Sequence, residues 1–337
     1  MRNMLGTVKK YLTAGEPLVL VTVIASSGAT PRGAGARMLI GRQGRICGTI
    51  GGGAVEYRSE QLAAEVLREG RSGEHDFSLT RDDVQNLGMI CGGAVNVFFH
   101  YIPAGDPETI ALADEAERRF AEGFDLWLLS DISDGGRLGL YSEKGGFFGL
   151  DAPEWLHGIL TRHPLRRIWE GRDFYVEQIN SSGRVYVFGC GHVAQELVPV
   201  LSHVGFRCVA LDDRPEFASR ELFPTAEEVL LIDLEKIADY ITVGPEDYVC
   251  VMTRGHAFDT TVQAQMLRTP ACYLGVIGSA SKKAGVFRKL GELGFTEADT
   301  DRITSPIGLE IKAETPAEIA ISIAGQLIEH RALRTER

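Results

Sequence analysis

The spacing of apolar residues gives the first half of the chain the pattern of short strands separated by glycine-rich turns. PLVLVTVIAS (17–26) predicts a β-strand, and ARMLIGRQGRICGTI (36–50) predicts a hairpin turned at Gly41 to Gly44. Gly51 to Gly53 then open AVEYRSEQLAAEVLREG, in which apolar residues recur at helical spacing on one face. We expect residues 1–150 to form an α+β domain.

The pattern changes after residue 150. Residues 151–181 have weak periodicity and end in a turn signal, which predicts a connector. Residues 182–337 alternate regularly between short β-branched runs and helical segments, as in a doubly wound parallel sheet. The last segment begins with Thr315, Pro316 and Glu318, a capping box that predicts a closing helix. The predicted fold class is α/β, an α+β domain followed by a Rossmann-like domain.

Composition and charge narrow the classes of function. The net charge of −11 argues against a nucleic-acid partner, because binding to phosphate backbones depends on clustered Lys and Arg. No apolar run approaches the roughly 20 residues of a membrane helix, and the amphipathic N-terminus lacks the pattern of a signal peptide. We therefore expect a cytoplasmic protein without a membrane partner. The six cysteines show no CxxC pair and no zinc or disulfide spacing.

A nucleotide-binding motif lies at the start of the second half. VYVFGCGHVAQEL places Gly189, Gly191 and Ala194 as G-x-G-x-x-A between a predicted strand and a predicted helix, and the next strand ends in Asp212, where a ribose-binding carboxylate is expected. Arg214 leaves open whether the cofactor carries a 2′-phosphate. The alternative is that the glycines only tighten the turn. The candidate nucleotide-binding residues are Gly189, Gly191, His192, Asp212, Arg214 and Ser279.

Two further strand ends should face the same crevice. MTRGHAFD carries His256 and Asp259, a pair that could orient an imidazole for acid–base work. IGSASKK carries Ser279 and Lys282, which could hold a phosphate. The candidate catalytic residues are thus His256, Asp259 and Lys282. Equally, the histidine could be a surface residue, the aspartate a helix cap and the lysine a solvated charge.

Glycine loops in the first half offer a second candidate site. GMICGGAVNV places Cys91 before Gly92 and Gly93, where backbone N–H groups could stabilise a thiolate and small neighbours leave room for a bulky ligand. Taken alone, burial is the more frequent role of a cysteine. ICGGAVN (90–96) echoes IGGGAVE (50–56), which fits either two loops that approach one ligand or a chance likeness between glycine-rich turns. Arg32 lies in a further glycine-rich loop suited to an anion or to a plain surface turn.

These segments together resemble a known family. SSGATPRGAGARMLI, GTIGGGAVE, GMICGGAVNV, YVFGCGHVAQEL, LDDRPEF, VMTRGHAFD, LGVIGSASKKAGVF and SPIGLEIKAETPAEIAISI are similar, in the same order, to the XdhC/CoxI accessory proteins of xanthine dehydrogenase. The chain departs from the family pattern in two places. Relatives often carry an acidic residue where His100 stands, and another histidine where Arg254 or Gly255 stands.

The resemblance implies a chaperone of the molybdenum cofactor (molybdopterin) rather than an enzyme. Such a protein binds the cofactor, supports its sulfuration with a cysteine desulfurase and delivers it to a xanthine-dehydrogenase-type molybdoenzyme. The alternative from the residues is an NAD(P)-dependent oxidoreductase that uses the Rossmann half. The Rossmann half could also bind another nucleotide or the molybdenum cofactor itself. We also expect a homodimer.

The resemblance carries the family's cofactor-related cysteine and its triple-glycine loop onto the first half of the chain. Its cysteine corresponds to Cys91, which would contact the molybdenum or its terminal sulfur, since a soft thiolate suits such a centre. The expected molybdopterin-binding residues are Cys91, Gly92, Gly93, Gly51, Gly52, Gly53 and Arg32.

Overall fold

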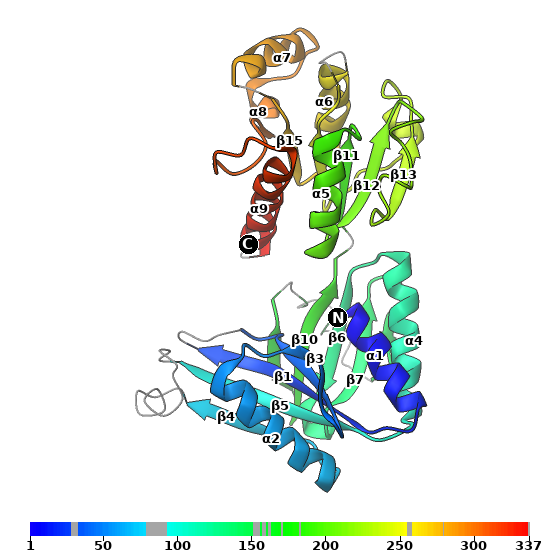
Figure 1. Cartoon of the computed structure of the whole chain (residues 1–337), viewed down its shortest axis with the longest axis vertical. Helices are drawn as coiled ribbons and strands as arrows, with labels where there is room; N and C mark the ends of the chain where they lie inside the picture. Colours follow the sequence, from blue (N-terminus) through cyan, green and yellow to red (C-terminus); the bar gives the residue numbers. More distant parts are fainter. Residues whose placement is uncertain are drawn as a thin grey trace. The chain divides into compact units, whose positions relative to one another are not determined.

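The chain folds into two compact units, Met1–Ser181 and Ser182–Arg337 (Figure 1). The computed structural model describes residues 1–27, 33–78, 93–150, 156, 160, 163–169, 171–181, 183–254, 258–278 and 280–335. We call the two parts unit 1 and unit 2 and describe each by itself.

Unit 1 contains a first antiparallel sheet of five strands. Its order is β3 (Gly44–Thr49), β2 (Arg37–Gly41), β1 (Leu18–Ser27), β5 (Ala94–Ile102) and β4 (Gly73–Ser78). The hairpin predicted at Gly41 to Gly44 is confirmed as β2–β3. Successive residues of β1 point to opposite faces of the sheet, and both faces are apolar. Val19, Val21 and Val23 pack against α2 (Gly53–Glu69), whereas Leu18 and Leu20 pack against α1 (Arg2–Thr13).

A second antiparallel sheet completes unit 1. Its order is β8 (Gly146–Phe148), β7 (Arg137–Ser142), β6 (Leu126–Asp131), β10 (Arg172–Asn180) and β9 (Leu165–Trp169), and the 3₁₀ turn η1 (Ile132–Asp134) follows β6. The helix α4 (Pro107–Glu122) packs Leu112, Ala116 and Phe120 onto one face of this sheet. Its N-terminus is capped by Asp106, whose carboxylate accepts a hydrogen bond from the Thr109 N–H at 2.9 Å.

The stretch 151–181 is therefore not only a connector, because β9 and β10 within it are strands of the second sheet. Its weak periodicity has a physical cause. Phe174 and Val176 are buried on one face of β10, whereas Tyr175 is buried on the other, so the alternation of polar and apolar residues is lost.

Unit 2 contains a six-stranded parallel sheet, which confirms the predicted Rossmann-like fold. The order is β13 (Glu228–Leu231), β12 (Arg207–Asp212), β11 (Arg184–Phe188), β14 (Tyr248–Val251), β15 (Tyr273–Val276) and β16 (Ile303–Thr304). The chain thus starts in the middle of the sheet, builds outward to β13 and then returns to the other side of β11. This reversal creates a crevice at the carboxyl ends of β11 and β14.

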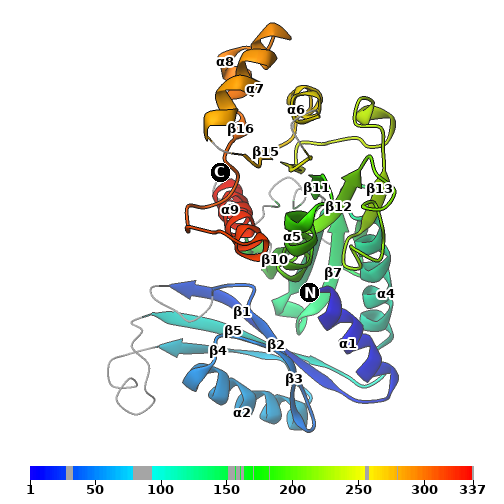
Figure 2. The ribbon, with the colours of Figure 1, turned by 45° about the horizontal axis from the view of Figure 1, so that its top comes forward.

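Helices cover both faces of the parallel sheet. On one face, α5 (His192–His203) and α9 (Pro316–Thr335) lie side by side (Figure 2) and share a core with Val185 and Val187. On the other, α6 (Asp259–Leu267) and α7 (Ala280–Glu292) share a core with Tyr186 and Phe188. The short elements η3 (Ile237–Asp239) and α8 (Glu297–Thr300) complete the unit. Strand β11 is therefore buried on both faces, as in a doubly wound fold.

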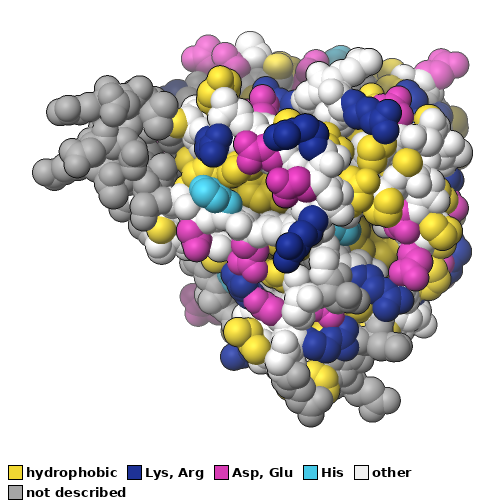
Figure 3. All heavy atoms as spheres, turned by 90° about the horizontal axis from the view of Figure 1, so that it is seen from below, with side chains coloured by type: hydrophobic (Ala, Val, Ile, Leu, Met, Phe, Trp, Pro, Cys, Tyr) yellow, Lys and Arg dark blue, Asp and Glu magenta, His cyan; other side chains and the backbone are white. Residues whose placement is uncertain are grey.

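The closing helix begins as its sequence predicts. The Glu318 carboxylate accepts a hydrogen bond from the Thr315 N–H at 2.9 Å, and the Thr315 hydroxyl accepts one from the Glu318 N–H at 3.3 Å. This reciprocal pair is a capping box. Within the described part of the chain, no helix has the length and apolar character needed to cross a membrane. On the face seen in Figure 3, Lys and Arg side chains are interspersed with Asp and Glu side chains.

Candidate functional site

The glycine turn between β11 and α5 uses its two glycines for different purposes. Gly189 has φ +98°, and a Cβ atom there would lie 2.4 Å from the Met252 carbonyl oxygen, so only glycine fits beside the end of β14. Gly191 caps the N-terminus of α5 with φ −73°, and a Cβ atom there would meet nothing within 4 Å. The first glycine allows close packing, and the second leaves open space in front of a helix N-terminus.

Asp212, at the end of β12, is buried beneath this turn. Its carboxylate accepts hydrogen bonds from the Cys190 N–H at 2.7 Å, the Arg214 N–H at 3.0 Å, and the Arg214 Nε and Nη2 at 2.8 and 3.0 Å. Burial alone would raise the pKa of this carboxyl, but the hydrogen bonds from Arg214 and from the two backbone N–H groups outweigh burial and lower it. Asp212 is thus ionised and fixes both the glycine turn and Arg214.

A pocket of about 470 Å³ opens beside the turn. The first turn of α5, from Gly191 to Ala194, forms one wall. The other described lining residues are apolar or cationic: Arg214, Phe217, Met252, Arg254, Ile277 and Pro316. The Arg214 guanidinium lies over the Phe217 ring, 3.8 Å from its centroid. The structure therefore brings Gly191, His192 and Arg214 together around a basic pocket, with Gly189 and Asp212 directly behind it.

The triple-glycine loop of unit 1 is held by a buried carboxylate. Gly51, Gly52 and Gly53 have φ values of +124°, +76° and +63°, all in the region that favours glycine. The Glu56 carboxylate, in the first turn of α2, accepts hydrogen bonds from the Ile50 N–H at 2.9 Å and the Gly52 N–H at 3.1 Å. The loop is thereby held in one conformation, and a Cβ atom at Gly52 would meet nothing within 4 Å.

Glu56 has two further partners, the Thr49 hydroxyl and the Arg45 guanidinium. Burial alone would raise the pKa of Glu56, but the hydrogen bonds from Thr49, Gly52 and Ile50 outweigh burial and lower it. Sequence reasoning noted Glu56 only as part of a family motif. Its acidic position in the first helical turn after a glycine loop was the signal that could have revealed this role.

Strand register shows where the loops of unit 1 begin and end. Ser27, the last residue of β1, pairs with Ala94, the first residue of β5, and Ser78 at the end of β4 pairs with Ala94 as well. Arg37 at the start of β2 pairs with Thr49 at the end of β3. The strand ends that flank the Arg32 loop, the triple-glycine loop and the Cys91 loop thus point toward the same end of one sheet (Figure 1). Because Arg37 also pairs with Thr22, the ends of β2 and β3 lie level with Thr22 of β1, not with Ser27.

Several predicted site residues lie outside the described residues: Arg32, Cys91, Gly92, His256 and Ser279, together with the side chain of Lys282. Gly93 is described and leads into β5. Asp259 is buried at the start of α6 and accepts a hydrogen bond from the Thr253 hydroxyl, with no side-chain cap on the helix. Among the residues that the structure describes, no group of three or more His, Cys, Asp or Glu side chains could hold a metal ion.

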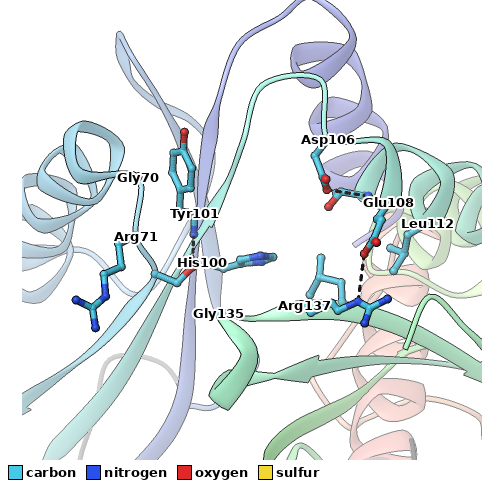
Figure 4. A pocket seen from close by; sticks show the side chains of 12 residues that line it. Gly70, Arg71, His100, Tyr101, Asp106, Glu108, Leu112, Gly135 and Arg137 are labelled. Carbon is cyan, nitrogen blue, oxygen red and sulfur yellow. Dashed lines mark hydrogen bonds and ion pairs between the residues drawn. The ribbon is translucent and has the colours of Figure 1, made fainter. Parts of the chain in front are cut away.

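Unit 1 also contains a pocket, of about 370 Å³, which the sequence does not predict (Figure 4). The His100 imidazole extends from β5 toward it, and Arg137 and Glu108 form an ion pair of 3.1 Å on the opposite side. His100 is only 8% exposed, and its Nδ1 has no hydrogen-bond partner in the described part of the chain. Burial lowers the pKa of His100 to about 4, against a smaller opposing effect of Asp106.

The parallel sheet, its glycine turn and its basic pocket define unit 2 as a Rossmann-type domain, joined to an antiparallel α+β domain with a triple-glycine loop held by Glu56. The comparisons agree with this class. Residues 185–327 match the XdhC Rossmann domain, and residues 11–78 match the XdhC and CoxI family. The chain belongs to the XdhC and CoxI family.

Individual relatives match over nearly the full length. A protein of Bacillus subtilis (strain 168) named as a probable xanthine dehydrogenase subunit is 26% identical, with 94% of each chain covered. The molybdenum cofactor insertion chaperone PaoD of Escherichia coli (strain K12) is 23% identical, with 99% of this chain and 90% of the relative covered. A crystal structure described as a xanthine dehydrogenase from Bacillus halodurans superposes with a TM-score of 0.78 at 25% identity, covering 99% of this chain and 96% of that one.

Proposed function

We propose that this protein is a chaperone that binds the molybdenum cofactor and inserts it into a xanthine-dehydrogenase-type molybdoenzyme. Family membership and the full-length similarity to a molybdenum cofactor insertion chaperone support this function. The observation that carries it is that the strand ends flanking three glycine-rich loops all point toward the same end of the first sheet. Backbone without side chains lets a bulky pterin approach closely. The Gly51 and Gly52 N–H groups themselves already donate to Thr49 and Glu56, which fixes the loop.

In this proposal the cofactor is the cargo of unit 1. Gly51, Gly52 and Gly53 provide a preformed surface because Glu56 already holds the loop that contains them. The loops of Arg32 and of Cys91 to Gly93 would complete the site, with Arg32 on the phosphate of the cofactor. The Cys91 thiolate would contact the molybdenum or its terminal sulfur. Sulfuration with a cysteine desulfurase stays a prediction from the family resemblance, and a homodimer stays a prediction from the long connector in the sequence.

A cysteine series tests the proposed site. Cys91→Ala should fold normally, lose most of the molybdenum and oxidisable pterin that copurify with the wild type, and fail to activate a client dehydrogenase. Cys208, which is buried in the core of unit 2, provides the matched control. Cys208→Ala should cost some stability, because it leaves a cavity, and should leave the pterin content unchanged. Wild-type cofactor content in Cys91→Ala would refute the role of this cysteine.

The basic pocket of unit 2 supports a second candidate, an NAD(P)-dependent oxidoreductase, since its fold and its glycine turn suit a dinucleotide. The two functions make opposite predictions for the purified wild type. A chaperone carries pterin and transfers no hydride from NADH or NADPH to any acceptor tested. Reproducible hydride transfer by a pterin-free preparation would favour the oxidoreductase.

A further inference from the structure

We propose that the pocket of unit 2 binds a phosphate group at the free edge of Arg214, and that Asp212 positions Arg214 instead of binding a ribose. The ligand class is a phosphomonoester, such as the 2′-phosphate of a dinucleotide. This inference concerns unit 2 alone and does not depend on the chaperone function proposed for unit 1.

The first step is the hydrogen-bonding capacity of Asp212. In a Rossmann turn, the acidic residue that ends the second strand commonly accepts hydrogen bonds from ribose hydroxyls. Two carboxylate oxygens offer about four acceptor positions. Here four N–H groups already occupy them, one from Cys190 and three from Arg214, and Asp212 is only 1% exposed. A ribose diol therefore finds no acceptor on this residue.

The second step is the orientation of Arg214. Its Nε and Nη2 face Asp212, and its guanidinium carbon lies over the Phe217 ring, 3.8 Å from the centroid. These two contacts leave this side chain little freedom. The Nη1 N–H groups have no hydrogen-bond partner among the described residues, and Arg214 lines the pocket. A guanidinium fixed in this way is preorganised for an anion and loses little entropy on binding it.

The third step is the charge of the pocket. Arg254 is exposed on a neighbouring wall, and the open space at Gly191 exposes the N-terminus of α5 to a ligand. None of the described lining residues is acidic, although the chain as a whole has a net charge of −11. Two guanidinium groups and a helix N-terminus favour a dianionic phosphate over a neutral diol. An arginine near this strand end is also the usual partner of a 2′-phosphate.

Calorimetric titration of the full-length protein with NADP⁺ and NAD⁺ tests the proposal, because the two ligands differ only in the 2′-phosphate. The wild type should bind NADP⁺ at least about tenfold more tightly. Arg214→Ala should reduce the affinity for NADP⁺ to that for NAD⁺, and Arg214→Lys should restore part of the difference. Asp212→Asn should also lower the ratio of the two affinities. A purely structural defect would instead weaken both affinities equally and leave their ratio unchanged. Lys236→Ala, which removes a highly exposed cation elsewhere in unit 2, is the control for net charge and should behave as wild type.

Inorganic phosphate distinguishes the sources of the phosphate. If NADP⁺ and NAD⁺ both fail to bind while phosphate binds to the wild type and not to Arg214→Ala, the site is a phosphate site for another phosphomonoester, including that of the pterin. The proposal is overturned if NAD⁺ binds as tightly as NADP⁺ and Arg214→Ala changes neither affinity. It is also overturned if neither dinucleotide nor phosphate binds to the wild type.

Discussion

His100 should make unit 1 lose stability in mildly acidic solution. The imidazole is buried between β5 and the turn at Gly136, where a Cβ atom would lie 2.9 Å from the ring, and it stacks on Phe98 with 6.3 Å between ring centroids. Burial favours the neutral form, so the pKa of His100 in the folded chain is about 4, whereas the ordinary value is 6.5. The unfolded chain therefore binds this proton at a higher pH than the folded chain.

The sign and the size of the effect follow from this difference. Above pH 6.5 the histidine is neutral in both states and does not affect the pH dependence. Between pH 6.5 and pH 4 the unfolded state gains a proton that the folded state does not, so the free energy of unfolding falls with falling pH. A difference of roughly 2.5 pKa units corresponds to about 3 kcal/mol by pH 4, below which the loss is complete.

The perturbation is His100→Leu, which replaces the imidazole with an apolar side chain of similar size and so removes the titrating group. Urea unfolding followed by tryptophan fluorescence reports on unit 1 selectively, because Trp127, Trp155 and Trp169 all belong to it. We expect the stability of the wild type relative to His100→Leu to fall by about 3 kcal/mol between pH 7 and pH 4.

The control is His75→Leu on the neighbouring strand β4, where the imidazole is exposed. This variant should keep the steep pH dependence of the wild type. If the stabilities of wild type and His100→Leu instead run parallel from pH 7 to pH 4, burial does not keep this histidine neutral and the reasoning is wrong.

Three further substitutions test the two glycine loops. Glu56→Gln should destabilise unit 1 by about 1–3 kcal/mol at neutral pH, because the charged carboxylate that accepts the hydrogen bond of the Ile50 N–H is lost. An unchanged thermal melting curve would contradict this. Gly189→Ala should cost unit 2 about 3 kcal/mol in denaturant unfolding, since its Cβ atom collides with backbone at a positive φ. Gly191→Val should melt within a few degrees of wild type and lose affinity for nucleotides or phosphate in calorimetry, whereas undiminished affinity would exclude the pocket as the binding site.

The Rossmann-like half could be predicted from the sequence because its signals are local. A strand, a glycine turn and a helix follow one another within about 20 residues, and the capping box of α9 needs only Thr315 and Glu318. The strand β10 could not be predicted in this way. Its residues are buried by two different layers, and nothing in its own sequence shows that both faces are covered.

The candidate sites show the same limit at the level of single side chains. The sequence indicates that Asp212 ends a strand at the expected distance from the glycine turn. It does not indicate how many donors reach the carboxylate, because one of them, the Cys190 N–H, comes from a segment 22 residues away. His100 drew notice only as a departure from the family pattern, and its burial depends on Gly136, which lies in a turn of the other sheet.

Glu56 and Asp212 lead to a common principle for the two units. Glu56 lies in the first helical turn after a glycine loop, and Asp212 ends the strand beside a glycine turn. Each carboxylate is buried and accepts hydrogen bonds from the backbone of its turn. Each is also paired with an arginine, Arg45 in unit 1 and Arg214 in unit 2. A glycine loop has high conformational entropy, so binding a ligand would be costly unless the loop were ordered beforehand. In both units an acidic residue beside the glycine turn holds the loop in the conformation that a ligand would meet, and for Asp212 this is the residue that the motif suggests as a ribose contact.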